Sequence, residues 1–153
     1  MKLVDLFEFI DPIPCFYHGS TIPDLKVLKC RPSKLVNDSV VFAATMPEIA
    51  IAMSGHWSDD DFDFGHNTDG KRPDLKFPPY VMKERKAGSF QKFFNQPIYL
   101  YEVPARYFQP DDNLQDFELI SYKDVPVHLS IKFDDPLAYL SASPVIQLIG
   151  TQT

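Results

Sequence analysis

Residues 16–20 read Phe16-Tyr17-His18-Gly19-Ser20, an apolar lead-in followed by an imidazole, a glycine and a hydroxyl. Cys15 to His18 is expected to form a strand that is apolar on both faces. Two later stretches also pass from an apolar run to polar residues, Val40-Val41-Phe42-Ala43-Ala44-Thr45 and Phe117-Glu118-Leu119-Ile120-Ser121. We therefore expect three strands to meet around one ligand.

Composition predicts one folded domain over residues 1–153. The chain has 153 residues, of which 44% are hydrophobic and 14% aromatic, enough to bury one sizeable core. The net charge of −6 and the pI near 5.1 disfavour a nucleic-acid partner, because such binding depends on clustered Lys and Arg that neutralise phosphates.

The cysteines predict neither a disulfide framework nor a metal site. Cys15 and Cys30 form no CxxC motif and have no matching histidine pair. Asp5 and Glu8 interrupt the apolar N-terminal pattern that a secretory signal requires, and no stretch is long enough to span a bilayer. We expect a cytoplasmic protein with reduced thiols and no membrane partner.

The pattern of apolar residues, prolines and turn residues predicts mostly strands with short helices. Strands are expected at 15–18, 25–28, 39–44, 97–104, 117–122 and 125–129, and a short strand or turn at 80–85. Helices are expected at 49–53, begun by Thr45 as the capping residue and Pro47 in the first turn, and at 136–140. Leu3 to Ile10 is expected as a short helix or edge strand, and Ser89 to Phe94 as a strand or turn.

Residues 55–79 are expected to form a long loop, a feature that is often a lid or binding element. Its acidic run, Asp59 to Asp63, lacks the glycine and distal glutamate of a calcium loop, so a solvated loop is the favoured interpretation. Trp57 is expected to anchor this loop on the core. The basic residues Lys83, Arg85 and Lys86 follow it and are candidates for contact with a pyrophosphate or for ordinary surface positions.

The order of these motifs resembles the ADP-ribosyltransferase superfamily. The resemblance rests on His18-Gly19-Ser20, the Phe42-to-Thr45 stretch, Tyr99-Leu100-Tyr101-Glu102-Val103, and Glu118-Leu119-Ile120-Ser121 followed by Val125, and covers roughly residues 15 to 130. It implies an α+β fold with a split antiparallel β-sheet core, short flanking helices and a cleft that binds NAD as the substrate.

The resemblance also implies a role for each site residue. His18 would bond a ribose hydroxyl, Gly19 would offer its backbone to the nicotinamide amide, and Ser20 would support the ribose or phosphates. Glu118 would be the catalytic carboxylate that stabilises the oxocarbenium-like ribosyl cation. Phe42 would stack on nicotinamide where His-type members carry tyrosine. Thr45 would contact the substrate, or cap the next helix, or both.

The function predicted on this basis is transfer of ADP-ribose from NAD to an unidentified acceptor, with a protein side chain, a nucleic acid, a small molecule or water as candidates. Asp116 stands where arginine-specific members carry Glu or Gln. Two alternatives stay open. One is a non-catalytic domain of the same fold that binds a protein partner or nucleotide. The other is an RNA 2′-phosphotransferase-like enzyme, which the acidic charge balance disfavours.

Overall fold

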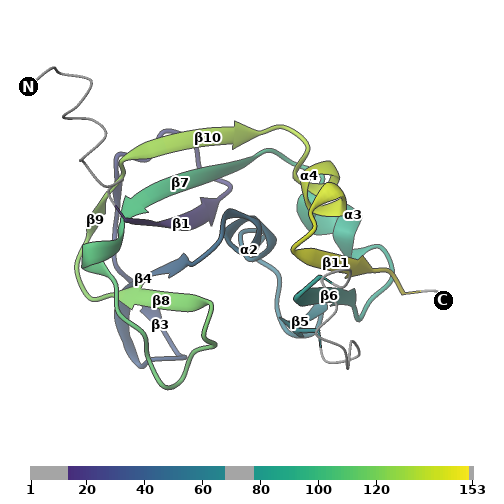
Figure 1. The fold of residues 1–153 in the computed structure, drawn as a ribbon, viewed down its shortest axis with the longest axis horizontal. Helices are drawn as coiled ribbons and strands as arrows, with labels where there is room; N and C mark the ends of the chain where they lie inside the picture. The colour runs from purple at the N-terminus through teal and green to yellow at the C-terminus, as the bar shows by residue number, and fades with distance from the viewer. Residues whose placement is uncertain (1–13, 68–77, 152–153) are drawn as a thin grey trace, which may run out of the picture.

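The structure, a computed structural model, describes residues 14–67 and 78–151. These residues form an α+β fold of mostly antiparallel sheets and three short α-helices (Figure 1), which confirms the expected class. The segment from Leu3 to Ile10 lies outside the described residues. No helix in the described part of the chain is long and apolar enough to cross a membrane.

The largest sheet has six strands. Their order is β10-β7-β1-β4-β3, with β8 paired to β4. The strands are β1 (Cys15–Ser20), β3 (Arg31–Ser33), β4 (Asp38–Ala44), β7 (Ile98–Pro104), β8 (Glu118–Ser121) and β10 (Leu129–Phe133). The sequence predicted β1, β4, β7 and β8 correctly, because each is rich in the β-branched and aromatic residues that favour strands. Figure 1 shows this sheet curving around the central helix.

Two smaller sheets complete the strands. One contains β5 (Phe62–His66), β6 (Tyr80–Glu84) and β11 (Ile146–Ile149), and in it β11 runs parallel to β6. The other is the pair of β2 (Val27–Leu28) and β9 (Val125–Pro126). The prediction of an unbroken loop over 55–79 was wrong at β5. Phe62 is buried while Asp63 is exposed, the alternation of a half-buried strand, and β5 pairs with β6 throughout its length.

Three short α-helices and one 3-10 turn accompany the sheets. They are α2 (Pro47–Ala52), α3 (Ser89–Phe94), α4 (Pro136–Ala142) and η1 (Ala105–Tyr107). α4 was predicted, and the Asp135 side chain caps it by accepting from Ala138 N–H at 3.0 Å. The prediction of a strand or turn at 89–94 was wrong, because Phe90 and Phe94 lie one helical turn apart and both face the core.

The cap predicted for α2 was also wrong. Met46 is the N-cap residue, with an extended backbone and no side-chain capping bond. Thr45 instead belongs to the end of the large sheet, where its N–H donates to the Phe117 carbonyl at 3.1 Å. Pro47 does begin the helix as expected, because a proline there leaves no hydrogen bond unmade.

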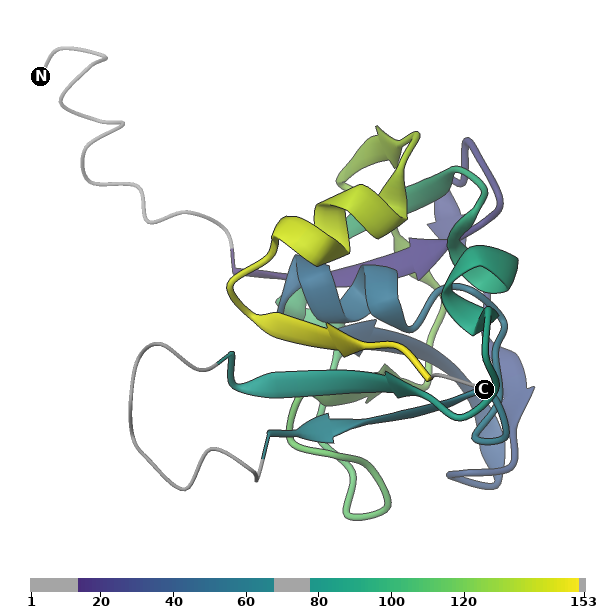
Figure 2. The same ribbon diagram turned by 90° about the vertical axis from the view of Figure 1, so that its right-hand side faces the viewer.

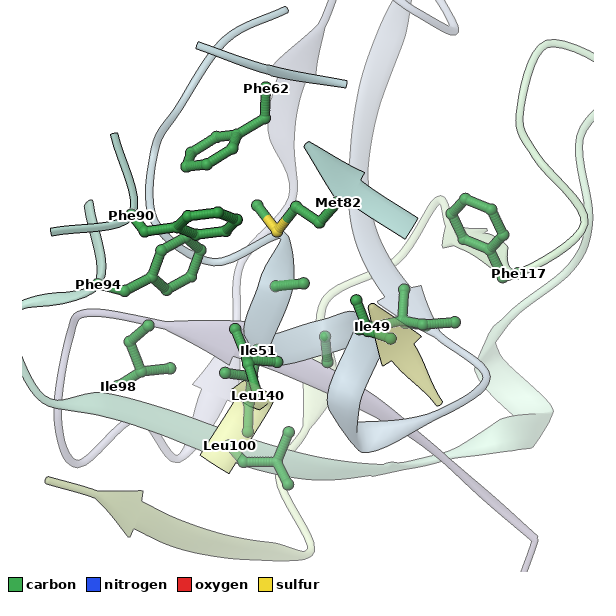
Figure 3. Close-up of a cluster of buried hydrophobic side chains, with 14 residues drawn as sticks. Ile49, Ile51, Phe62, Met82, Phe90, Phe94, Ile98, Leu100, Phe117 and Leu140 are labelled. Atoms are coloured by element: carbon green, nitrogen blue, oxygen red, sulfur yellow. The ribbon is translucent and has the colours of Figure 1, made fainter. Parts of the chain in front are cut away.

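The main hydrophobic core lies between the large sheet, the helices and the β11-β6-β5 sheet. Figure 3 shows its packing: Phe62, Phe90 and Phe94 gather beside Met82, while Ile49 and Ile51 of α2 fill the centre. In Figure 2, α2 and α4 are stacked above the small sheet. Trp57 anchors its segment as expected: its ring meets Phe62 edge-on at 5.2 Å, and its Nε1–H donates to the Ala52 carbonyl at 2.7 Å.

A second core lies on the other face of the large sheet. Its buried members are Leu28, Val41, Ala43, Tyr101, Val103 and Val125, so the β2-β9 pair covers this face. β1 therefore has apolar surroundings on both faces, as its sequence predicted: Tyr17 packs against the main core and Phe16 against the second. This double burial fixes the strand that carries the first predicted site residues.

Candidate functional site

The large sheet separates between β1 and β4. β1 pairs with β7 along its whole length, from Cys15–Pro104 to Ser20–Tyr99, but its register with β4 is confined to Tyr17–Ala44. Beyond that point, strand pairing between β1 and β4 ends although both strands continue. We call this place the split. Main-chain groups that face the split need partners other than a neighbouring strand.

His18 supplies one of those partners. Its Nδ1 lies 2.7 Å from the carbonyl oxygen of Phe42, and because a carbonyl only accepts, Nδ1 carries the hydrogen. Burial lowers the pKa of His18, against the raising effect of this hydrogen bond, and the positive charge of Arg31 lowers it further. The ring is therefore neutral at pH 7, and Nε2 is an acceptor for a hydroxyl group.

A cavity of about 470 Å³ lies at the split, a size within the range of small-molecule and cofactor sites. We call it the split cavity. It brings together five of the six predicted site residues from three strands that are far apart in the sequence: His18, Gly19, Ser20, Phe42 and Glu118. Thr45 does not line the cavity and is exposed, so the structure places it outside this site.

Glu118 begins β8 and lies opposite Ala44 of β4. Its side chain is half-buried, and desolvation raises the pKa of its carboxyl group. Burial is the cause of this shift, and among the described residues no cationic side chain forms an ion pair with this carboxylate. An uncompensated carboxylate at the wall of a cavity suits a ligand that develops positive charge.

Gly19 has a packing role that the sequence did not indicate. A Cβ atom at this position would lie 2.2 Å from the Ala50 carbonyl oxygen and 2.7 Å from Ser54 Cβ. Only a glycine therefore lets α2 lie this close to β1. The expected contact between the Gly19 backbone and nicotinamide is compatible with its place in the cavity lining and remains a prediction.

The end of β1 is held by a network that shapes one wall of the cavity. Ser20 Oγ accepts from Ile22 N–H at 3.0 Å, which forms a tight turn after the strand. The hydroxyl of Tyr101 donates to the Ile22 carbonyl at 2.5 Å and accepts from Leu25 N–H at 3.3 Å. Because Tyr101 is fully buried, it fixes the segment that carries Ile22 and Leu25 along the cavity.

Sequence reasoning missed the cations of the site. Lys29 and Arg31 line the cavity, whereas the basic residues singled out from the sequence do not. Lys83 is exposed on β6, and Arg85 and Lys86 form ion pairs with Asp63 and Asp61. Lys29 is paired with Asp124 at 3.4 Å. Arg31 is the lining residue whose positive charge contributes to lowering the pKa of His18. Arg31 belongs to β3, a three-residue strand that the sequence did not predict.

The mouth of the cavity is apolar. Seven large hydrophobic side chains are exposed among the described residues, and four of them line this cavity: Ile22, Val27, Leu35 and Met53. Exposed apolar side chains that gather at one hollow, rather than scatter singly, mark a binding surface. The mouth therefore offers apolar contact to the ring or chain of a ligand.

Asp116 does not line the cavity. Its carboxylate lies 2.9 Å from Nε2 of His66 on β5, and both side chains are largely exposed. The Asp116 carboxylate is therefore engaged by the His66 ring and is not directed at the split cavity.

In the described parts of the chain, no group of three or more His, Cys, Asp or Glu side chains could hold a metal ion. Comparison of the chain with models of protein families, with curated proteins and with solved structures gave no match.

Proposed function

We propose that this protein transfers ADP-ribose from NAD to an acceptor, and hydrolyses NAD when water is the acceptor, on an ADP-ribosyltransferase-like split sheet. The observation that carries the proposal is the convergence of His18, Ser20, Phe42 and Glu118 on one cavity at the split. These residues come from three separate strands, and their chemistry matches the parts of one substrate. Within the described part of the chain, the Glu118 carboxylate forms no ion pair and Nε2 of His18 has no hydrogen-bond partner, so both groups can meet a ligand.

In the proposed reaction the bond between C1′ of the ribose and nicotinamide nitrogen breaks. The electron pair goes to the nitrogen, so nicotinamide leaves as a neutral molecule and C1′ becomes electron-poor. The Glu118 carboxylate stabilises this charge and accepts a hydrogen bond from the ribose 2′-hydroxyl. The acceptor then forms the new bond to C1′ and loses a proton to solvent or a nearby base. Glu118 must be ionised to act in this way.

The remaining residues bind and orient the dinucleotide. His18 Nε2 accepts from a ribose hydroxyl, because Nδ1 is committed to the Phe42 carbonyl. The Phe42 ring stacks on nicotinamide, and the Arg31 guanidinium binds the pyrophosphate, for which its fixed charge and several donors suit it. The apolar mouth packs against the adenosine end of the substrate.

The test is nicotinamide release from NAD by full-length wild-type protein, Glu118→Gln and the matched control Asp112→Asn, each with and without cell lysate as a source of acceptors. Asp112 is exposed. We expect release by the wild type and the control and a loss of about 10²-fold or more in Glu118→Gln, the scale on which a single group that stabilises transition-state charge acts. Equal release by wild type and Glu118→Gln would disprove the catalytic role.

A non-catalytic binding domain is the second candidate, because β4 contributes Phe42 to the cavity, and this side chain lacks the hydroxyl of the tyrosine that His-type members carry on the second strand. It predicts saturable NAD or nucleotide binding without nicotinamide release. Binding of NAD that Glu118→Gln leaves unchanged, combined with no turnover in any condition, would favour this candidate. Transfer of a 2′-phosphate from RNA to NAD would instead identify the RNA 2′-phosphotransferase alternative.

A further inference from the structure

A second cavity, of about 270 Å³, lies on the α2 and α4 side of the large sheet. We call it the β10 groove. Its walls are largely apolar or aromatic, and Glu102 is the one charged residue in the lining. The lining residues are Tyr17, Pro47, Leu100, Glu102, Leu129, Ile131, Phe133 and Tyr139. Tyr17 lines both cavities, but none of the other residues of the β10 groove lines the split cavity. The β10 groove therefore needs its own explanation.

The charge in the groove is negative. Cys15 Sγ lies 2.8 Å from Glu102 Oε1 and donates to it, and within the described residues Glu102 Oε2 accepts no hydrogen bond. Glu48 lies near both tyrosines and contributes to raising the pKa of Tyr17 and of Tyr139, after burial as the larger cause. Lys132 on β10 alternates with Ile131 and pairs with Asp134, so it does not neutralise the groove.

Aromatic rings and aliphatic walls surround this charge. The rings of Tyr139 and Phe133 pack at 4.6 Å between centroids, and Tyr17 comes from β1 at the centre of the sheet. A long basic side chain matches such a lining, because its methylene stem packs on apolar walls while its charged head meets a carboxylate and aromatic faces. A carboxylate ligand or a phosphate would be repelled by Glu102.

The mouth of the groove indicates that the basic side chain belongs to a polypeptide. β10 is the last strand of the sheet order, so in the described residues it pairs only with β7, and Figure 1 shows it along one border of the molecule. Leu129 and Ile131 on this strand are 49% and 46% exposed. An open strand edge with exposed apolar residues is a surface to which an extended peptide adds as a further strand.

We propose that the β10 groove binds an arginine or lysine side chain of a partner polypeptide that lies along β10, with Glu102 as the counter-charge and Tyr17 and Tyr139 as aromatic contacts. This inference is independent of the proposed activity toward NAD, because the groove residues other than Tyr17 take no part in the split cavity. The charge complementarity of the groove and the open edge beside it support the same occupant.

The experiment uses full-length protein and two probe peptides of matched shape, acetyl-Val-Arg-Val-amide and the same peptide with neutral citrulline in place of arginine. Binding is measured by calorimetry and by NMR signals of the tyrosine side chains. We expect the arginine peptide to bind at least about tenfold more tightly than the citrulline peptide, the difference expected for one charge-assisted contact.

Two variants and a control locate the site. Glu102→Gln removes the counter-charge, and Ile131→Lys places a cation at the exposed mouth, where folding is not at risk; both are expected to lower affinity about tenfold or more. Lys132→Gln, on the other face of β10, is expected to bind normally. Equal binding of both peptides, or binding that Ile131→Lys leaves unchanged, would overturn the proposal. Failure to bind either peptide would also overturn it, and self-association through β10 would then identify a second copy as the occupant.

Nicotinamide release separates this proposal from the proposed function. Ile131→Lys is expected to release nicotinamide at the wild-type rate while it loses the arginine peptide. Glu118→Gln is expected to show the reverse pattern. Each proposal can therefore fail while the other stands.

Discussion

His18 and Phe42 are joined across the split, where Nδ1 of the imidazole donates to the main-chain carbonyl at 2.7 Å. In an unbroken sheet that carbonyl would accept from the main chain of a neighbouring strand. The His18 side chain, which has a proposed role in substrate binding, thus supplies the hydrogen bond that a main-chain carbonyl needs where β1 and β4 separate. Stability and binding are coupled at this residue, so it is the first residue to substitute.

His18→Ala is expected to lower the free energy of unfolding by about 1–3 kcal/mol, because the Phe42 carbonyl loses its partner in a partly buried place. The pH dependence should change as well. The pKa of His18 is lowered in the fold, so the unfolded chain binds more protons near and below pH 6.5, and this residue costs stability as pH falls through that range. Urea unfolding from pH 7.5 to pH 5 measures both effects.

The control for that measurement is His128→Ala, because the His128 side chain is exposed. It should unfold like the wild type across the same pH range. If His18→Ala retains the full loss of stability toward pH 5, the lowered pKa of His18 is not its source.

Glu118→Gln is expected to make the protein more stable at pH 7.5 while nicotinamide release is lost. Burial raises the pKa of this carboxyl, so the folded chain holds its proton at pH values where the unfolded chain has released it. The contribution of Glu118 to stability therefore falls as pH rises from 4.5 through its raised pKa, and Glu118→Gln removes that contribution. Thermal unfolding from pH 4 to pH 8 tests this, and a variant that is less stable at pH 7.5 would contradict it.

The pH dependence of turnover should follow the same group in the opposite sense. Only the ionised carboxylate stabilises a ribosyl cation, so nicotinamide release should rise with pH through the raised pKa of Glu118. A rate that is constant from pH 4 to pH 8 would remove Glu118 from the mechanism.

Gly19→Ala is expected to destabilise the fold by about 1–3 kcal/mol, because the added methyl group meets the Ala50 carbonyl and Ser54 Cβ and displaces α2. Gly65→Ala is the matched control, since no atom lies within 4 Å of a Cβ at that position. Chemical denaturation of both variants gives the comparison. Equal effects would mean that α2 can move away from β1 at no cost.

Tyr101→Phe is expected to lower stability by about 1–2 kcal/mol and to weaken NAD binding. The hydroxyl makes two bonds, to the Ile22 carbonyl and from Leu25 N–H, and the phenylalanine ring keeps the packing of the second core. Tyr122→Phe, at an exposed position, should change neither quantity. Normal NAD affinity in Tyr101→Phe would show that the segment of Ile22 and Leu25 is not part of the binding site.

The sequence predicted the α+β class, the strands β1, β4, β7 and β8, and the helix α4, because their apolar runs are bounded by prolines and polar residues. For β6 it left a strand and a turn open. It did not predict β5, where acidic residues mask the alternation of Phe62 and Phe64. The spacing of Phe90 and Phe94 is that of a helix face, but over the six residues of α3 periodicity alone does not separate a helix from a strand. β11 was missed because its short run, Ile146 to Ile149, is recognisable as a strand only beside β6.

The split cavity was predicted in part. His18, Gly19, Ser20, Phe42 and Glu118 were chosen from motif order, and the structure gathers them. The sequence predicted Thr45 as the cap of α2, one residue before the actual N-cap, Met46. Threonine is a preferred capping residue, but the main chain of Thr45 is hydrogen-bonded to Phe117 at the end of the large sheet. Arg31 carried no local signal. Its proximity to His18 depends on how β3 pairs with β4, which is a property of the fold and not of the stretch itself.

The central place of β1 has a consequence for how the chain reaches this fold. β1 precedes both of its neighbours in the sequence, and its full-length partner β7 ends only at Pro104, after the whole of β2 to β6 has been made. During synthesis on the ribosome β1 therefore waits without its main partner. Such pairing between distant segments is slow to form, so we expect refolding over milliseconds to seconds and a need for protection of β1 until β7 emerges.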